Sequence, residues 1–468
     1  MKINITFLFS IATLMAVSSC GKKYLDYKPD QRQVVPQKLD DFQALLDNTT
    51  VMNEQSSTNL GLIGGDEYYV TEAQYNGIVT STTNDFQKNA YIWADQVFQG
   101  REPVQIDWTA GYNHIMLANL ALGKTADSGP EAGEQEKWNL LKGNALFFRA
   151  LNFYQLAQLH CPVYNAATAR EDLGLPLRLD ADPTIKMARS SVEDTYLRII
   201  ADLTAAEGLL PDNPVVFFRP GKAAVYALLT RVYMQQGLYD KALDYANKCL
   251  QLNSRLTDFN TLSFTGNFTF PAQGNNNVEV IFMNNAYGFI IVSSTATGGS
   301  TFNADSALLK SYTPGDLRYN AYWTQSGART VFKGSYKGTA AYFTGFATDE
   351  VYLNRAECLA RTSQPAAALT DLNTLRQHRF TPGSYVELNS SDEQQVLDWV
   401  IAERRKELVV RGTRWEDLRR LNKEPRYATA IVRQLGATRY ELKPGDVKWT
   451  WPLPVEAIQN GGYEQNLR

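Results

Sequence analysis

The sequence predicts an all-α protein, built from tetratricopeptide-like helical hairpins with long loop insertions and a few short β segments. Residues Ala223 to Leu252 form two runs with helical periodicity, separated by Gly237, and small and large residues recur at tetratricopeptide spacing. Residues 349–379 repeat those internal spacings. A composition of 44% hydrophobic and 20% charged residues is ordinary for a folded globular chain.

The first residues have the pattern of an export signal. Lys2 precedes an apolar run from Ile3 to Val17, and Cys20 follows two serines, an arrangement that resembles a bacterial lipobox. We therefore expect residues 1–19 to be a lipoprotein signal peptide, and Cys20 to carry lipid at the start of a tether formed by residues 20–38. An ordinary signal peptide that contains a cysteine is the alternative.

We expect residues 39–468 to form a single domain with two helical parts. Besides the hairpins, three amphipathic segments predict helices, at residues 108–122, 136–159 and 190–211. Ser190 or Ser191, three residues before Glu193 or Asp194, has the spacing of a capping box at the start of the last segment. The helical scaffold is expected at about 105–255 and 348–425, with a loop-rich insertion at about 256–347.

The insertion and one earlier loop carry the candidate ligand-binding residues. The insertion is rich in Gly, Asn, Thr and aromatic residues, with short β-like runs at Val278 to Met283 and Phe289 to Val292. Loops on a rigid scaffold often hold binding surfaces, and aromatic rings stack on flat ligands such as sugars. If loops 66–76 and 287–323 converge, the candidates are Asp66, Tyr68, Tyr69, Tyr75, Tyr287, Tyr322 and Trp323. The alternative is that these aromatic residues pack the loops onto the helices.

Motifs for catalysis and metal binding are missing from the sequence. The cysteines Cys161, Cys249 and Cys358 are widely spaced, and the three histidines are scattered, so we expect neither a metal site nor a cofactor. Asp180 and Asp182 could be a pair of catalytic carboxylates, but such pairs are common in proline-containing loops. We therefore expect no enzyme activity.

A basic block at residues 401–422 raises the alternative of nucleic-acid binding. The formal net charge of −3 gives no overall positive field to attract a polyanion. Carboxylates alternate with the basic residues at helical spacing, which favours a structural role that joins helices, with a break at Gly412. The expected pairs are Glu403 with Lys406, Glu407 with Arg411, and Glu416 with Arg420.

Several segments, in their order along the chain, resemble the SusD/RagB family. They are the lipobox with YLDYKP, the helix with Trp108, Tyr112, Ile115, Ala118 and Asn119, ALFFRALNFYQLAQL, SVEDTYLRIIADLTAAEGLLP, AAVYALLTRVYMQQGLYDKAL, ERRKELVVRGTRWEDLRR and WPLPVEAIQN. The resemblance covers nearly the whole chain after the signal peptide.

The resemblance implies a lipid-anchored protein of the outer membrane, exposed at the cell surface. Such a protein would capture a nutrient oligomer and pass it to a SusC-like, TonB-dependent transporter. An oligosaccharide is the favoured ligand and a peptide is the alternative. A secreted glycoside hydrolase and a helical-repeat adaptor for protein partners are the other two hypotheses.

Overall fold

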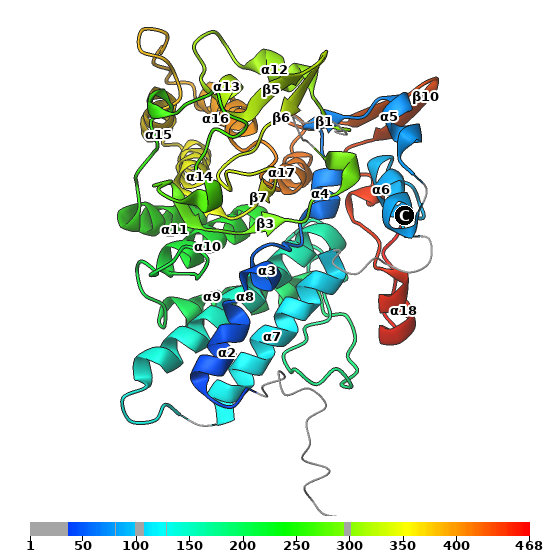
Figure 1. Cartoon of the computed structure of the whole chain (residues 1–468), viewed down its shortest axis with the longest axis vertical. Coiled ribbons are helices and arrows are strands. Elements are labelled where there is room, and N and C mark those ends of the chain that lie inside the picture. The colour runs from blue at the N-terminus through cyan, green and yellow to red at the C-terminus, as the bar shows by residue number, and fades with distance from the viewer. Residues whose placement is uncertain (1–35, 80, 99–106, 128, 294–300) are drawn as a thin grey trace, which may run out of the picture.

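The computed structural model describes residues 36–79, 81–98, 107–127, 129–293 and 301–468, and helices dominate it (Figure 1). Consecutive helices pack side by side: α7 on α8, α8 on α9, α10 on α11 and α14 on α15. Helix α11 also packs on α14, and this contact joins helices α7–α11 to helices α14–α16. The predicted all-α class is confirmed. The helices of this scaffold are α7 (Asp107–Asp127), α8 (Gln135–His160), α9 (Val192–Glu207), α10 (Lys222–Gln236), α11 (Tyr239–Leu252), α14 (Thr348–Arg361), α15 (Pro365–Gln377), α16 (Glu393–Glu407) and α17 (Arg414–Leu421).

The hairpin of α10 and α11 has the predicted tetratricopeptide form. Gly237 ends α10 with a φ of 73°, a left-handed conformation that glycine adopts without steric cost. On α11 the small residues Ala242, Ala246 and Cys249 are fully buried, so the two helices approach closely along this stripe. The predicted positions of the turn and of the helix interface are confirmed.

The junction of α8 and α9 combines a helix cap with a buried ion pair. The hydroxyl of Ser191 accepts a hydrogen bond from the amide of Asp194 at 3.0 Å, which confirms the predicted cap at the start of α9. Arg149 of α8 forms two hydrogen bonds of 2.8 Å with the carboxylate of Asp202 on α9. The long loop between the two helices therefore leaves their packing intact.

Short helices and two-stranded antiparallel sheets fill the rest of the chain. The strand pairs are β1 (Tyr68–Tyr69) with β4 (Asn303–Ala304), β2 (Val280–Phe282) with β8 (Phe346–Ala347), β3 (Asn285–Ala286) with β7 (Tyr342–Phe343), β5 (Trp323–Ser326) with β6 (Arg329–Phe332), and β9 (Ile431–Leu435) with β10 (Thr438–Leu442). The short helices are α2 (Leu39–Leu46), α3 (Thr49–Met52), α4 (Asn59–Gly64), α5 (Glu72–Gly77), α6 (Thr82–Tyr91), α12 (Ser306–Ser311), α13 (Arg318–Tyr322) and α18 (Val455–Gly461). The 3₁₀ helices are η2 (Phe259–Thr261), η3 (Ala272–Gly274), η4 (Ile290–Val292) and η5 (Val447–Trp449).

One of the two predicted β runs is wrong. Strand β2 lies in the first run, but the second run forms the 3₁₀ helix η4. The amide of Val292 donates to the carbonyl of Phe289 at 3.2 Å, and the amide of Ile291 donates to the side chain of Gln87 on α6. Because these donors are satisfied within the turn and by α6, this segment needs no partner strand.

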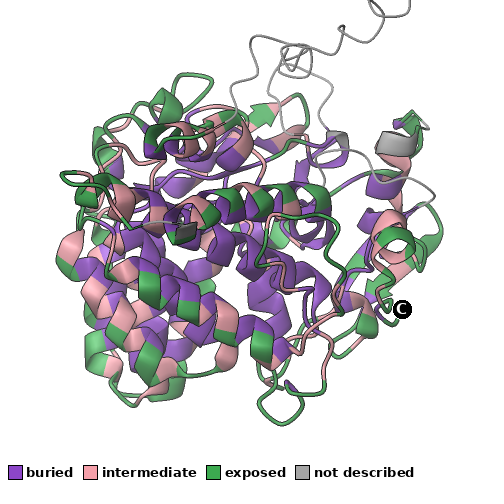
Figure 2. Cartoon of the chain, turned by 90° about the horizontal axis from the view of Figure 1, so that it is seen from below, coloured by how far each residue is buried: buried purple, intermediate pink, exposed green. Residues whose placement is uncertain are grey.

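The buried residues form a continuous interior beneath an exposed outer layer (Figure 2). One hydrophobic cluster lies among α7 to α11, and a second, rich in aromatic residues, joins the early short helices to the insertion and to the last strands. The C-terminal segment closes this interior. The side-chain amide of Asn466 donates to the carbonyl oxygens of His160 at 2.8 Å and of Trp451 at 2.7 Å.

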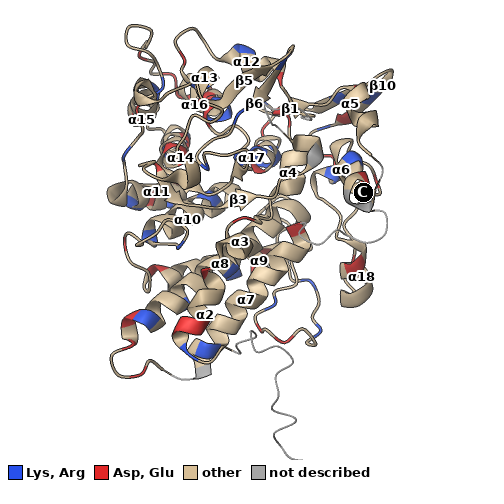
Figure 3. Cartoon of the chain, in the orientation of Figure 1, with Lys and Arg blue, Asp and Glu red and all other residues tan. Residues whose placement is uncertain are grey.

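The basic block is structural, as predicted, but most of its partners are distant in sequence. Basic and acidic residues, blue and red in Figure 3, both occur along α16 and α17. Of the three expected pairs, only Glu403 with Lys406 forms, at 2.7 Å. The pairings of Glu407 with Arg411 and of Glu416 with Arg420 are wrong, because these residues have other partners. Glu407 binds Arg318 and Arg379, and Arg411 binds Asp349. Glu416 accepts from Tyr154, and Arg420 binds Glu357 and, within α17, Asp417.

The helix break also differs from the prediction. Helix α16 ends at Glu407, five residues before Gly412, and α17 begins at Arg414. Between them, both Val410 and Gly412 have positive φ, at 54° and 76°. The amide of Val410 donates to the buried carboxylate of Glu67 at 2.7 Å, which holds this turn away from the helical path.

Candidate functional site

The two predicted binding loops meet in the structure. Strands β1 and β4 pair antiparallel, with Tyr68 opposite Ala304 and Tyr69 opposite Asn303. The side-chain amide of Asn303 also donates to the carbonyl of Tyr69 at 3.0 Å. The loop that starts at residue 66 and the insertion are therefore joined by backbone and side-chain hydrogen bonds.

Three of the six candidate aromatic residues lie in the core instead of on a surface. Tyr68, Tyr322 and Trp323 are 3%, 1% and 3% exposed. The ring of Tyr68 stacks on Phe302 with centroids 5.0 Å apart, and Trp323 packs on Phe332 at 5.8 Å. Trp323 lies in the core because the β5–β6 hairpin turns its indole inward.

The remaining three, Tyr69, Tyr75 and Tyr287, are exposed or partly exposed, and we name them together the aromatic face. Tyr69 is 47% exposed and Tyr287 is 40% exposed. Side chains alternate across a strand, so burial of Tyr68 turns Tyr69 outward. Tyr287 packs on Phe289, which contacts Phe86 of α6. Tyr75 contacts Tyr91 of the same helix, with ring centroids 6.1 Å apart. A contribution of these three rings to ligand binding stays a prediction.

The carboxylate of Asp66 forms ion pairs that hold segments of the fold together. Its carboxylate accepts two hydrogen bonds from Arg414, at 2.7 and 2.8 Å, and lies 3.2 Å from Arg405. Arg414 and Arg405 outweigh the effect of burial and hold the pKa of Asp66 far below its usual range. This carboxylate joins the early loop to the basic block, and that partnership was not predicted.

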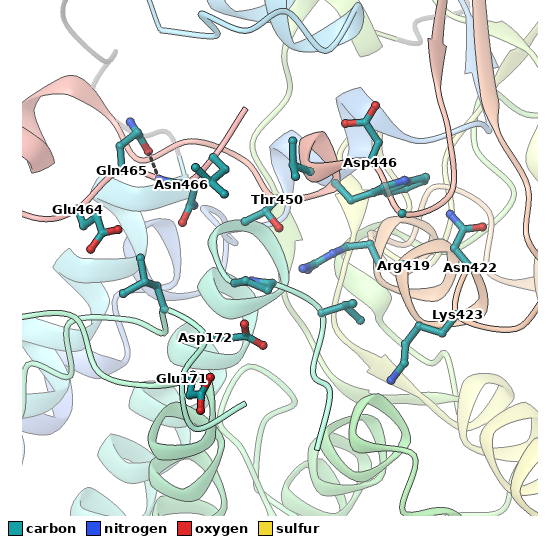
Figure 4. A pocket seen from close by; sticks show the side chains of 17 residues that line it. Glu171, Asp172, Arg419, Asn422, Lys423, Asp446, Thr450, Glu464, Gln465 and Asn466 are labelled. Carbon is teal, nitrogen blue, oxygen red and sulfur yellow. Dashed lines mark hydrogen bonds between the residues drawn. The ribbon is translucent and has the colours of Figure 1, made fainter. Parts of the chain in front are cut away.

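One cavity beside the C-terminal segment has a volume of about 610 Å³ (Figure 4). Four segments line it: residues 162–173 after α8, the end of α17, residues 445–450 and residues 464–467. Its walls carry charges of both signs, and one aromatic residue, Trp449, contributes to them. The charged lining residues are Arg419, Lys423, Glu171, Asp172, Asp446 and Glu464. Sequence reasoning missed this cavity because its four segments share no motif.

A second cavity, of about 450 Å³, lies between the start of α7, the loop at 178–183 and helix α18. We call it the aromatic pocket. Its lining residues are Trp108, Thr109, Tyr112, Arg178, Pro183, Glu456, Ala457, Asn460, Gly461 and Tyr463. Trp108 and Tyr112 were singled out in the sequence as parts of a helix motif, but Tyr463 and Arg178 were not.

Asp180 and Asp182 organise a loop. The carboxylate of Asp180 accepts from the amide of Asp182 at 2.8 Å, and the carboxylate of Asp182 accepts from both the amide and the hydroxyl of Thr184. Each contact spans two residues, which is the pattern of an Asx turn. This arrangement accounts for both carboxylates without a catalytic role.

Burial suppresses the reactivity of His160 and of the three described cysteines. It lowers the pKa of His160 to about 3 and raises the pKa of the Cys161 thiol to about 11. Cys249 and Cys358 are buried free thiols whose pKa values are also raised by burial. Within the described ranges, no group of three His, Cys, Asp or Glu side chains is placed to hold a metal ion.

The expected signal peptide, Cys20 and most of the expected tether lie outside the described residues. Across the part of the chain that the structure describes, every helix is too short or too polar to cross a bilayer. Both observations leave the expected lipid anchor at Cys20 as a prediction.

Comparisons with known proteins agree on one family. Residues 23–234 match a family described as "Starch-binding associating with outer membrane", and residues 292–467 match the SusD family. SusD-like protein P2 of Formosa agariphila is 28% identical over 150 residues, an alignment that covers 32% of this chain and only 27% of that relative.

Solved structures show the same fold. A SusD superfamily protein from Bacteroides thetaiotaomicron is 21% identical, with a TM-score of 0.71 over 92% of this chain and 100% of that one. Surface glycan-binding protein A from Bacteroides fluxus is 16% identical, with a TM-score of 0.67 over 92% of this chain and 99% of the other.

Proposed function

Because this chain belongs to the SusD/RagB family, we propose that it is a non-catalytic binding protein that captures a nutrient oligosaccharide at the outer membrane. The family description and the glycan-binding relative of similar fold support this ligand class. We further propose that the protein delivers its ligand to a SusC-like, TonB-dependent transporter.

The observation that carries the proposal is the aromatic face. Tyr69 and Tyr287 each expose at least 40% of their surface, so part of each ring is open to a ligand. Flat rings with a polar edge suit the faces of sugar rings, and the hydroxyl of each tyrosine adds a hydrogen-bonding group. The hydrogen bonds between β1 and β4 fix the backbone beside Tyr69, so little order has to be gained on binding.

Calorimetric titration against panels of glycans and peptides tests this proposal. We expect at least one oligosaccharide to bind, and Tyr69→Ala and Tyr287→Ala each to weaken its binding by on the order of 1 to 4 kcal/mol. Leu197→Ala is the control, because Leu197 is also exposed, at 53%, but lies on α9 in the scaffold. Binding of peptides alone would favour the peptide-capturing alternative, and unchanged affinity in both tyrosine variants would move the ligand site elsewhere.

The lipid anchor has a separate test. We propose that acyl chains on Cys20 supply most of the membrane affinity, so Cys20→Ala should release a folded protein into the soluble fraction. Cell fractionation after a high-salt wash measures this release, in cells without the transporter partner. A Cys20→Ala protein that remains with the membrane would contradict the anchor.

The proposed transporter partner can be identified directly. Affinity purification of the lipidated protein from solubilised outer membranes should recover a TonB-dependent barrel, recognised by mass spectrometry. Recovery of other protein partners, together with a lack of glycan binding, would favour the adaptor hypothesis.

A further inference from the structure

The aromatic pocket has the chemistry of a sugar site and is separate from the aromatic face. It brings together three aromatic residues from two distant segments. Trp108 and Tyr112 lie one turn apart on α7, with ring centroids 4.7 Å apart, and Tyr463 lies 6.3 Å from Trp108. By contrast, the larger cavity beside α17 has a single aromatic lining residue.

The helical wall of the pocket is fixed by buried hydrogen bonds. The carboxylate of Asp107 accepts from the amides of Asn59 and Leu60 at 2.9 and 2.8 Å, which anchors the start of α7 just before Trp108. The hydroxyl of Tyr112 donates to the carbonyl of Pro176 at 2.9 Å. Both aromatic residues of α7 are therefore held in place before any ligand arrives.

The loop wall is equally constrained. The side chain of Asn119 donates to the carbonyls of Arg178 and Asp180, at 3.0 and 3.1 Å, and Arg178 donates to the carbonyl of Asp182 at 2.9 Å. These bonds position the guanidinium of Arg178 at the pocket. A rigid loop that presents a polar group lowers the entropy cost of binding.

The third wall is α18 and the residues that follow it. The ring of Tyr463 lies so close to Gly461 that a side chain at position 461 would displace it. Asn460, next to this glycine, is exposed and contributes an amide that can both donate and accept hydrogen bonds. The close approach to Gly461 thus sets the position of the third aromatic ring.

We propose that the aromatic pocket is a second saccharide-binding site, selective for an uncharged oligosaccharide. The partly exposed rings of Tyr112 and Tyr463 offer stacking surfaces beside the buried Trp108, while Arg178 and Asn460 offer hydrogen-bonding groups for hydroxyl groups. Among the described lining residues the charged ones are Arg178 and Glu456, whose opposite signs favour neither an anionic nor a cationic ligand. A volume of about 450 Å³ admits part of an oligosaccharide.

The inference rests on the proposed function for its ligand class, so the test separates the two sites. The purified protein is labelled with 5-fluorotryptophan, and the fluorine resonance of Trp108 among the eight tryptophans is assigned from Trp108→Phe. The aromatic face is disabled by combining Tyr69→Ala with Tyr287→Ala. The probes are maltoheptaose, xylohexaose and mannohexaose, with an oligogalacturonate as the anionic counterpart.

We expect at least one neutral probe to shift the Trp108 resonance saturably in the protein with the disabled face. Ala457→Phe should fill the pocket and weaken this binding at least tenfold, whereas Ala367→Phe, at an exposed position of α15, should leave it unchanged. If circular dichroism shows that Ala457→Phe is misfolded, Asn460→Ala at the exposed rim replaces it, with at least a threefold loss expected.

Two results would overturn the second site. One is a Trp108 resonance that no neutral probe shifts, while the unmodified protein binds one of them through the aromatic face; the proposed function would then stand. The other is a shift by the oligogalacturonate alone, which contradicts the uncharged ligand. If no probe binds the unmodified protein either, both the pocket and the proposed function lose their oligosaccharide ligand.

Discussion

The α10–α11 hairpin and the junction between α16 and the insertion bury their residues in opposite ways. The hairpin packs small apolar residues such as Ala242, which leaves no polar side chain to satisfy at that contact. The junction buries a network of acidic and basic groups, which we call the charged junction: Glu279, Asp316, Arg318, Arg379, Glu403 and Glu407, each no more than 4% exposed. Apolar packing tolerates approximate partners, but a buried charge needs a specific one.

Arg379 shows how closely the charged junction is matched. Its guanidinium donates to Glu279 at 2.9 Å, to Glu407 at 2.8 Å and to the carbonyl of Thr257 at 2.8 Å. It also lies over the ring of Phe259, 4.1 Å from the centroid. One side chain therefore joins α16 to three positions of the insertion.

The largest effect is expected from breaking the charged junction. Arg379→Met removes the partner shared by Glu279 and Glu407 and leaves two carboxylates buried, which should cost about 3 to 5 kcal/mol of unfolding free energy. Urea denaturation measures this loss. The control is Arg426→Met, which removes an ion pair with Asp398 at the surface and should change the midpoint little. Similar midpoints for the two variants would show that the charged junction contributes no more than a surface pair.

A buried carboxylate with weaker compensation should make stability depend on pH. Burial raises the pKa of Glu67 to about 7, although it accepts a hydrogen bond from the amide of Val410. Between pH 4.5 and 7 the folded state therefore binds more protons than the unfolded state at this site. Its contribution to stability is complete below pH 4.5 and is lost as the pH rises through 7.

Glu67→Gln should remove this part of the pH dependence, because the amide does not titrate and keeps an oxygen for Val410. The variant and the parent protein should have similar stability near pH 4.5. Above pH 4.5, the free energy of unfolding of the variant should rise relative to that of the parent protein by up to about 1.4 kcal/mol per pH unit, until pH 7. Denaturation curves at several pH values measure the difference, and a constant difference across this range would refute the raised pKa.

A moderate effect is expected from overpacking the hairpin. Ala242→Leu adds three carbon atoms at a fully buried helix contact and should cost about 1 to 3 kcal/mol. Ala366→Leu, at an exposed position on α15, makes the same change without the clash. An unaltered denaturation midpoint for Ala242→Leu would mean that the hairpin can shift to accommodate a larger side chain, so that its packing is less specific than the charged junction.

The smallest effect should come from a single helix cap. Ser191→Ala removes the acceptor for the amide of Asp194 and should destabilise the protein by about 1 kcal/mol. Ser191→Asn should largely preserve stability, because asparagine caps helices about as well as serine. Equal losses in both variants would point to packing around residue 191 as the cause.

Sequence reasoning succeeded where a pattern is local. The hairpin turn at Gly237, the small residue at Ala242 and the cap at Ser191 each depend on neighbours within about one or two helical turns, so their spacing alone predicts them. The partners of the basic block could not be predicted in this way. Arg379 and Glu279 are 100 residues apart, and no periodicity relates them.

The candidate site shows the same limit. The pairing of β1 with β4 agrees with the predicted meeting of two loops, but the aromatic content of a loop does not reveal which rings turn inward. Strand alternation separates Tyr68 from Tyr69 once the strand is known. The inward position of Trp323 depends on the β5–β6 hairpin, and the aromatic pocket depends on Tyr463, which reaches Trp108 from a segment more than three hundred residues away.

The hydrogen bonds of Asn466 constrain how the chain can fold. Its amide satisfies the carbonyl of His160, at the end of α8, across 306 residues of sequence. Closing so long a loop is slow, and native contacts of this kind form late. Arg189 donates to the same carbonyl at 3.2 Å from only 29 residues away, so the end of α8 can gain one native partner early, and Asn466 adds the second one later. In folding intermediates the contact from Arg189 should therefore form before the contact from Asn466.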